Sequence, residues 1–588
     1  METVHCKHND FAGPERLLEK GPFNKPIRQK RGAREIMRGQ KILDGLTAED
    51  PAPKIAGWLL AFFVLLALAL RFMLYRYHHM IEGDGIHYAA LARLISHDRN
   101  FLGAANEYWS NLWPLVIAAF DVFVHDIELA GRLASSVFGS LTVVPVYLIS
   151  REFLNARASL VAASLVVAQP FLLRFSVLLY TESFYTFLLA WVIWLGVRLI
   201  KSPDLRERWL WLGLLVGVGL WTRPEVQAPA FLFVIVSLVR SFLKRIAIKK
   251  ALIGGLMFAG VVLIFLFSRA ILIHHYIGRW HFGFSEKVTF NIQEGLLYYG
   301  EHEKYLNRFE NGRFVNLRPE KRNLLSFLWE NRGLVIGRLK SNVSRILPSF
   351  AEVLAPTKGI PIHRKAGLGL TLLGILGMLL QKKTRRWALL LILIVVLYSI
   401  PWLFIFIVDR LVVPLAIFSA IFTAAGLLVL ESAVAVLFKR RRITAWPVLS
   451  FLIVISFIMR TATWVRHDRN FAWENDPVVQ KAAGLFLKDR YSQETRILTW
   501  GSHIPYYFYE GNPYDASIQN IPYAPLEEVL DFVRREKVAL LVLPEWVLLS
   551  WDFPIKGLAA QGAQADGLDF VKMIGLVKPE RIWIYKVL

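Results

Sequence analysis

The sequence predicts an α-helical polytopic membrane protein of about eleven spans, with one re-entrant or interfacial segment and a small α/β domain outside the membrane at its carboxyl end. Of the 588 residues, 55% are hydrophobic and 20% are charged, and the mean hydropathy is +0.42. This composition is too apolar for an ordinary soluble protein. The apolar residues also gather in successive runs. The first run, 55–74, has about the 20 residues that a helix needs to cross the hydrocarbon core.

The Lys and Arg residues lie in short clusters between these apolar runs, as positive charges do when they set membrane topology. We therefore interpret the formal charge of +23 as a topology signal and expect no nucleic acid partner. The single cysteine, Cys6, excludes an intramolecular disulfide and a metal site built on thiolates.

Residues 1–54 are polar and basic and precede the first apolar run. They lack an apolar core followed by a small-residue cleavage site, so we interpret them as a cytoplasmic tail and not as a signal peptide. Residues 55–463 then form the transmembrane domain, with outer loops at 75–130 and 274–365. The second loop is too long for a simple turn, which favours a lid or a binding element.

The segment 111–125 decides the topology. It is apolar but short and contains Pro114 and Asp121, which favours a partial helix. If it does not cross the membrane, every basic cluster between the later spans lies on the inner side, as the positive-inside bias requires. We therefore predict a multi-pass protein of the plasma (inner) membrane with its amino terminus in the cytoplasm and its carboxyl terminus outside. The expected spans are 55–74, 131–150, 157–173, 182–200, 208–222, 226–243, 251–273, 366–381, 386–408, 410–430 and 443–463.

Residues 464–588 differ in character from the rest of the chain and predict the extracytoplasmic α/β domain. No nucleophile elbow, P-loop or dinucleotide fingerprint is present there. The periodicity of this domain predicts helices at 477–488 and 525–536 and strands at 496–500, 539–543, 570–574 and 581–587.

The stretch 81–95 follows the first span directly and places two carboxylates, Glu82 and Asp84, just outside the membrane. Glycines on both sides of Asp84 allow a tight turn. From Tyr88 onward, apolar residues recur at helical spacing, which predicts a helix along the interface. A simpler interpretation is that Asp84 only caps this helix.

The predicted topology brings further charged residues to the same face. Charged side chains close to the hydrocarbon are costly and usually face a cavity or a partner, so their convergence at the ends of several helices favours a site. Each residue alone has a simpler explanation, because an arginine at a span end can extend its head group to water. These residues are Arg132, Glu182, Arg223, Glu225, Asp409 and Arg410.

Short markers follow one another along residues 55–430. They are Gly83-Asp84 with Tyr88, Trp113-Pro114, Gly131-Arg132-Leu133, Phe138-Gly139, Pro170 before Thr181-Glu182, Thr222-Arg223-Pro224-Glu225, and Asp409-Arg410 with Pro414. Their order and spacing resemble the GT-C glycosyltransferases, which include protein O-mannosyltransferases and the aminoarabinose transferases that modify lipid A. The resemblance implies a GT-C-like transmembrane domain in which Asp84 is the catalytic carboxylate and Glu182 the acid of the later corner. Many relatives have a second acid directly after the first, where this chain has Gly85, and Glu82 lies two residues earlier instead.

The expected chemistry can also be argued from charge. A charged nucleotide sugar does not cross the bilayer, so a transferase that faces outward needs a lipid-carried sugar, such as a polyprenyl-phosphate sugar. The departing phosphate needs a cation, and the acceptor hydroxyl needs a base. No cofactor is required, although the acids leave room for a divalent cation. The candidates for an inverting displacement are Asp84, Glu182 and Glu82 as catalytic acids, Arg223, Arg410 and Arg132 as phosphate ligands, and Tyr88, Glu225 and Asp409 as substrate-binding residues.

Two other classes of function fit parts of the sequence. A secondary transporter or flippase would use the carboxylates as proton carriers, but transporters commonly have paired halves with interrupted helices, and no such repeat is present. A receptor would leave the convergence of acids and arginines unexplained. As partners we expect membrane lipid, the polyprenyl-phosphate donor and an acceptor that is a lipid, a glycan or a protein. We hypothesise that the domain at 464–588 helps to choose this acceptor and does no chemistry.

Overall fold

The structure is a computed structural model. It describes residues 56–75, 81, 83–106, 108–245, 248–278, 324–354, 361–404, 409–437, 478–513, 517–550, 552–561, 565–575 and 580–588, and the separate positions 46, 280, 282, 292, 308–310, 313–315, 455, 456 and 459. The predictions for the tail 1–54 apart from Leu46, for Glu82, for the span 443–463 apart from positions 455, 456 and 459, and for parts of the loop 274–365, among them 293–307 and 316–323, lie outside the described residues.

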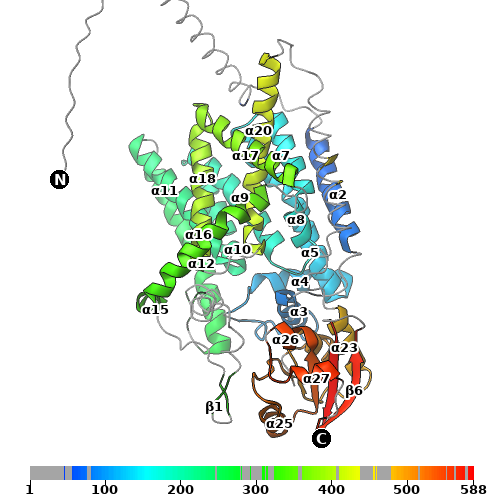
Figure 1. Ribbon diagram of the computed structural model, residues 1–588. Coiled ribbons are helices and arrows are strands. Elements are labelled where there is room, and N and C mark those ends of the chain that lie inside the picture. Colours follow the sequence, from blue (N-terminus) through cyan, green and yellow to red (C-terminus); the bar gives the residue numbers. More distant parts are fainter. Residues whose placement is uncertain are drawn as a thin grey trace, which may run out of the picture.

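The described residues before 438 form mainly a bundle of helices (Figure 1). A short hairpin, β1 (Arg308–Glu310) with β2 (Arg313–Val315), lies within the loop 274–365. The helices are α2 (Ala56–Leu74), α3 (Gly83–Ser96), α4 (Leu112–Val124), α5 (Ile127–Leu141), α6 (Val143–Arg151), α7 (Ala156–Ala168), α8 (Pro170–Phe175), α9 (Glu182–Lys201), α10 (Arg206–Thr222), α11 (Gln227–Leu243), α12 (Ile248–Ile277), α15 (Leu324–Glu330), α16 (Arg332–Leu354), α17 (Pro361–Leu380), α18 (Arg385–Ser399), α19 (Asp409–Val412) and α20 (Ala416–Leu437).

The predicted number of about eleven spans is not confirmed. Among the described residues, seven helical segments are long and apolar enough to cross a membrane. The predicted span 157–173 is divided, because α7 ends before Pro170 and Gln169 caps the short α8 by accepting a hydrogen bond from the Leu172 amide. The seven segments are Ala56–Leu74, Ile127–Arg151, Glu182–Lys201, Pro224–Leu243, Ile248–Ile277, Arg385–Leu403 and Arg410–Val434.

The segment 111–125 forms the short helix α4. Its 13 residues extend about 20 Å at 1.5 Å per residue, less than the roughly 30 Å of hydrocarbon core. After the turn that follows α4, the Asp126 side chain accepts a hydrogen bond from the Leu129 amide and caps the start of α5. The length of α4 agrees with the predicted partial helix.

The centre of the bundle is closely packed. The segment Arg410–Val434, which contains α20, is the most buried of the seven. It approaches α17 at Gly374 and Gly426, where a Cβ would lie 1.8 Å from the Phe422 carbonyl oxygen and 1.9 Å from the Leu370 carbonyl oxygen, respectively. Only glycine permits two helices to come so close.

The described residues from 478 to 588 form a second unit, in which the six elements predicted for this part of the sequence are present. Its sheet has the order β4-β3-β5-β7-β6, with β3 parallel to β4 and β5, and β7 antiparallel to β5 and β6. The strands are β3 (Ile497–Leu498), β4 (Ser517–Ile518), β5 (Leu540–Pro544), β6 (Leu568–Ile574) and β7 (Ile582–Val587), and the helices are α23 (Val478–Lys488), α24 (His503–Phe508), α25 (Leu526–Arg535), α26 (Glu545–Ser550) and α27 (Lys556–Gln561).

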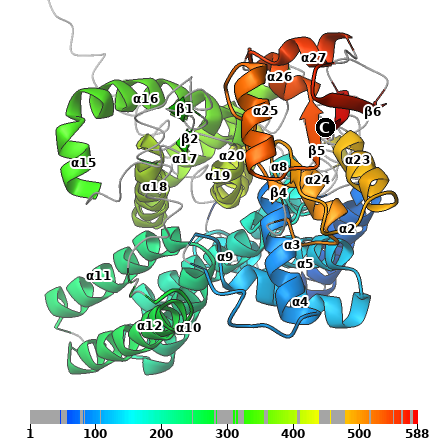
Figure 2. The ribbon, with the colours of Figure 1, turned by 90° about the horizontal axis from the view of Figure 1, so that it is seen from below.

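This C-terminal unit lies at the end of the bundle where α3 and α4 are found (Figure 1). Figure 2 shows α24 beside α3. Tyr506 of α24 is buried in a cluster formed mainly by α3, α4 and α5. The first outer helix and the C-terminal unit are therefore packed together.

Candidate active site

Asp84 lies in the first turn of α3 and is paired across the fold. Its Oδ2 accepts a hydrogen bond from Nη1 of Arg410 at 2.5 Å. The turn leaves little space, because a Cβ on Gly83, which has φ +20°, would lie 3.2 Å from the Tyr180 hydroxyl, and a Cβ on Gly85 would lie 2.9 Å from Ile81 Cγ2. The ion pair with Arg410 shows that Asp84 does more than cap α3.

Glu182 begins α9 at a corner that α4 and α5 hold in place. Trp113 of α4 donates from Nε1 to the Leu179 carbonyl at 3.0 Å. Gly131 of α5 lies against the same residue, since a Cβ there would come within 2.6 Å of Leu179 Cγ. The corner buries the Glu182 side chain, which is 4% exposed.

Arg223 joins Glu182 to Glu225. It follows the end of α10 in an extended conformation, as residues before proline prefer. Its Nη1 donates to Glu182 Oε1 at 3.1 Å and its Nη2 to Glu225 Oε1 at 3.2 Å. Burial opposes the charge of Arg223, but Glu225 and Glu182 hold its pKa well above the ordinary value. We call Glu182, Arg223 and Glu225 the charged triad.

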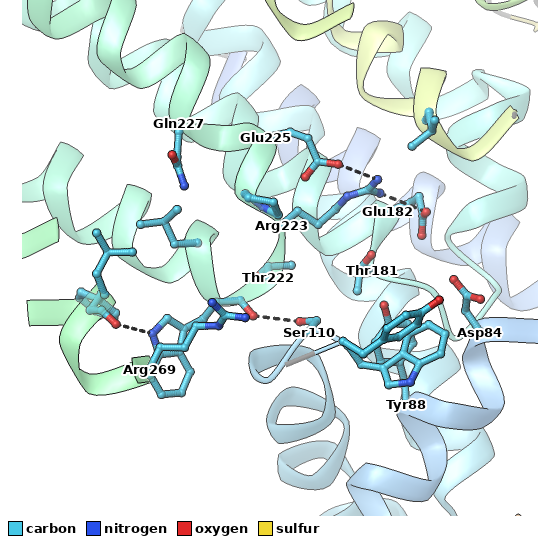
Figure 3. Close-up of a pocket in the computed structure, with 18 of the residues that line it drawn as sticks. Asp84, Tyr88, Ser110, Thr181, Glu182, Thr222, Arg223, Glu225, Gln227 and Arg269 are labelled. Atoms are coloured by element: carbon cyan, nitrogen blue, oxygen red, sulfur yellow. Dashed lines mark hydrogen bonds and ion pairs between the residues drawn. The ribbon is translucent and has the colours of Figure 1, made fainter. Parts of the chain in front are cut away.

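One pocket brings Asp84 and the charged triad together (Figure 3), and Arg410 lines the same pocket. Tyr88 also lines it, and burial followed by the nearby Asp84 charge raises the pKa of Tyr88, so its hydroxyl keeps its proton at neutral pH. Aromatic side chains and hydroxyl or amide groups complete the lining, which suits a ligand with a ring and polar substituents. They include Tyr108, Trp109, Trp221, Phe265 and Phe282, and Ser110, Thr181, Thr222 and Gln227.

Arg269 of α12 lines the pocket too, and the sequence prediction missed it. It is 9% exposed, and within the described part of the chain no carboxylate pairs with its guanidinium. Figure 3 shows it on the side of the pocket away from Asp84. An arginine inside an apolar run is the signal that identifies such a residue, because its cost is usually offset by a cavity or a partner.

Not all of the predicted site residues lie in this pocket. Tyr88, Glu225, Arg223 and Arg410 line the pocket, but Arg132 is not among the lining residues of the described chain. Its Nη2 donates to Glu128 Oε1 at 2.9 Å, one turn away on α5. The side chain of Asp409, which begins α19, and the whole of Glu82 lie outside the described residues.

No group of three or more His, Cys, Asp or Glu side chains that could hold a metal ion is found in the described ranges. The three acids of the pocket are instead paired with arginines, Asp84 with Arg410 and the other two with Arg223. A divalent cation stays a prediction.

A family model described as dolichyl-phosphate-mannose-protein mannosyltransferase matches residues 112–266, and no curated protein is significantly similar to the chain. The fold is similar to ArnT from Cupriavidus metallidurans bound to undecaprenyl phosphate, at 12% identity and a TM-score of 0.53, covering 90% of this chain and 98% of that one. It is also similar to the archaeal oligosaccharyltransferase AglB from Archaeoglobus fulgidus in complex with an inhibitory peptide and a dolichol-phosphate, at 13% identity and a TM-score of 0.52, covering 88% and 73%.

This chain has the GT-C fold. The match to the family model runs from the start of α4 to α12 and therefore includes the corner at Glu182 and the whole charged triad. Asp84, Arg269 and Arg410 lie outside the matched residues but line the same pocket. The expected resemblance is confirmed at the level of the fold.

Proposed function

We propose that this protein transfers a sugar from a polyprenyl-phosphate donor to an acceptor hydroxyl on the outer face of the membrane. The observation that carries the proposal is the pocket, where Asp84, the charged triad, Arg269 and Arg410 meet from segments far apart in the sequence. The structures of ArnT with undecaprenyl phosphate and of AglB with a dolichol-phosphate support a lipid phosphate as the ligand of such a fold.

In the proposed reaction the acceptor oxygen attacks the anomeric carbon while the bond from that carbon to the phosphate oxygen breaks. The hydroxyl proton passes to the Asp84 carboxylate, and the phosphate leaves with the bonding electron pair. A single displacement of this kind inverts the anomeric centre. Asp84 is the proposed base because its carboxylate is more accessible to an acceptor, its side chain being 24% exposed whereas that of Glu182 is 4% exposed.

Arg269 is the proposed main ligand of the phosphate. Arg223 already donates to two carboxylates and Arg410 to one, whereas Arg269 has no such partner among the described residues. A guanidinium presents a fork of donors that matches two phosphate oxygens. In this proposal Arg410 and Arg223 hold the acids with which they are paired. Tyr88 and Glu225 bind the sugar, and Asp409 and Glu82 remain candidates for substrate binding and catalysis.

The test begins with the lipids that copurify with the protein, because mass spectrometry of these lipids identifies the donor. Asp84→Asn keeps the shape of the side chain but cannot take a proton. It should lower single-turnover transfer by about 100-fold or more while donor affinity stays near the wild-type value. Asp98→Asn, at an exposed position just beyond α3, is the matched control.

Near wild-type transfer by Asp84→Asn would exclude Asp84 as the base. Loss of donor binding with normal turnover of the bound donor would instead assign Asp84 to substrate binding, and the base would then be sought at Glu182 or Glu82.

A further inference from the structure

We propose that Tyr507 of the C-terminal unit is a positioning residue that holds the turn bearing Asp84, an inference that rests on the proposed transfer reaction. Tyr507 lies on α24, beside α3. Its hydroxyl accepts a hydrogen bond from the Ile81 backbone N–H at 3.2 Å and donates to Glu128 Oε2 at 3.4 Å. One hydroxyl thus joins three segments: the turn before α3, helix α5 and the C-terminal unit.

Glu128 fixes the direction in which the Tyr507 hydroxyl donates. Lys481 of α23 donates to Glu128 Oε2 at 3.2 Å, and Arg132 donates to Oε1 at 2.9 Å. Glu128 thus accepts from both cations and from Tyr507, and since the Ile81 N–H can only donate, the Tyr507 hydroxyl donates to Glu128 and offers a lone pair to Ile81. Lys481 also lies 4.9 Å from the centre of the Tyr507 ring, which restrains the ring itself.

Ile81 transmits this restraint to Asp84. It precedes α3 by two residues, so its N–H has no carbonyl partner inside that helix, and its side chain is fully buried. A buried N–H needs a hydrogen-bond partner, and Tyr507 supplies it. The Ile81 side chain fills the space beside Gly85, where a Cβ would lie 2.9 Å from Ile81 Cγ2. A shift of Ile81 therefore shifts the turn that carries Asp84.

Through these contacts Arg132 and the C-terminal unit affect the reaction, although neither is among the described residues that line the pocket. Arg132 orients Glu128, Glu128 orients the Tyr507 hydroxyl, and Tyr507 holds Ile81. The C-terminal unit then acts on turnover through Asp84, whereas donor affinity depends on the arginines of the pocket.

The test uses Tyr507→Phe in the full-length protein. This change removes the hydroxyl and keeps the ring, which packs edge-on against Tyr506 with centroids 5.2 Å apart. We expect single-turnover transfer about 3- to 10-fold slower, because the reacting groups are less well positioned, and affinity for undecaprenyl phosphate within about twofold of wild type. Glu128→Gln should slow transfer similarly and add little in the double variant, since both act through one hydroxyl.

Tyr509→Phe is the matched control. Its hydroxyl donates to the Thr495 carbonyl within the C-terminal unit at 2.8 Å, so its loss should affect the stability of the unit and leave turnover unchanged. Hydrogen exchange in a peptide covering 81–88 gives a readout that does not depend on transfer, and it should be faster in Tyr507→Phe but not in Tyr509→Phe.

Unchanged exchange at 81–88 in Tyr507→Phe would overturn the inference, as would equal turnover in this variant and wild type. Equal losses of turnover in the Tyr507 and Tyr509 variants would also overturn it, because they would indicate a purely structural effect. If the wild-type protein transfers no sugar at all, the proposed function fails, and the exchange result still decides whether Tyr507 holds the turn.

Discussion

Arg269 gives the sharpest test of how the pocket binds an anion. Arg269→Met keeps most of the apolar length of the side chain and removes the cation. No carboxylate in the described chain pairs with Arg269, so the change leaves no buried partner charge behind. We therefore expect an unchanged or higher unfolding temperature together with weaker binding of the lipid phosphate. This combination is unusual, because loss of a buried charge commonly weakens the fold as well.

The expected loss of affinity follows from the contact that Arg269 offers. A hydrogen bond to a charged group contributes about 1.5 to 3 kcal/mol, which corresponds to roughly 10- to 150-fold in the dissociation constant of undecaprenyl phosphate. Arg269→Lys should recover only part of this, because an ammonium group cannot present the paired donors of a guanidinium. The measurements are binding of undecaprenyl phosphate and thermal unfolding on the same purified variants.

Lys250→Met is the control for charge. Lys250 is exposed on the same helix, 19 positions before Arg269, which corresponds to about 28 Å along the axis. The Lys250→Met variant should bind undecaprenyl phosphate as the wild type does. Wild-type affinity in Arg269→Met would refute the assignment of Arg269 to the phosphate. A fall in affinity that only follows a lower unfolding temperature would refute it too.

Two further predictions concern the charged triad and the topology. Arg223→Met should destabilise the protein by about 3 to 5 kcal/mol, because it leaves Glu182 and Glu225 buried without their cation; thermal unfolding no different from that of Arg269→Met would contradict this. In a Cys6→Ser background, Ser492→Cys, at an exposed position of the C-terminal unit, should react with an impermeant maleimide in intact cells and Ser202→Cys should not, and the reverse pattern would invert the proposed orientation.

Much of the pocket could be predicted because its residues lie at helix ends, where charge beside an apolar run is visible in the sequence. Asp84, Glu182, Arg223, Glu225 and Arg410 were predicted on this ground and share one pocket. Their pairing was not predictable, since the Asp84–Arg410 contact joins residues 326 positions apart.

Two arginines show what the sequence pattern leaves open, Arg132, which was predicted as a phosphate ligand, and Arg269, which was not predicted. Arg132 lies near the start of α5, but its guanidinium donates to Glu128 one turn away. Glu128 in turn contacts Tyr507 of the C-terminal unit, so Arg132 faces that unit. Arg269 lies inside an apolar run, and its side chain is directed to the pocket only by the rotation of α12 against α10. Periodicity predicts that a helix forms, but not which of its faces meets a pocket.

The charges of the pocket are arranged to match the proposed transition state. Asp84 and Arg410 neutralise each other formally, the charged triad carries one excess negative charge, and Arg269 carries one positive charge. Glycosyl transfer builds positive charge at the sugar ring and negative charge on the leaving phosphate. A phosphate at Arg269 places the sugar ring toward the triad and Asp84, so each developing charge faces its opposite. Bound the other way, the phosphate would lie against the two glutamates of the triad, and this repulsion selects the orientation in which Asp84 can reach the acceptor hydroxyl.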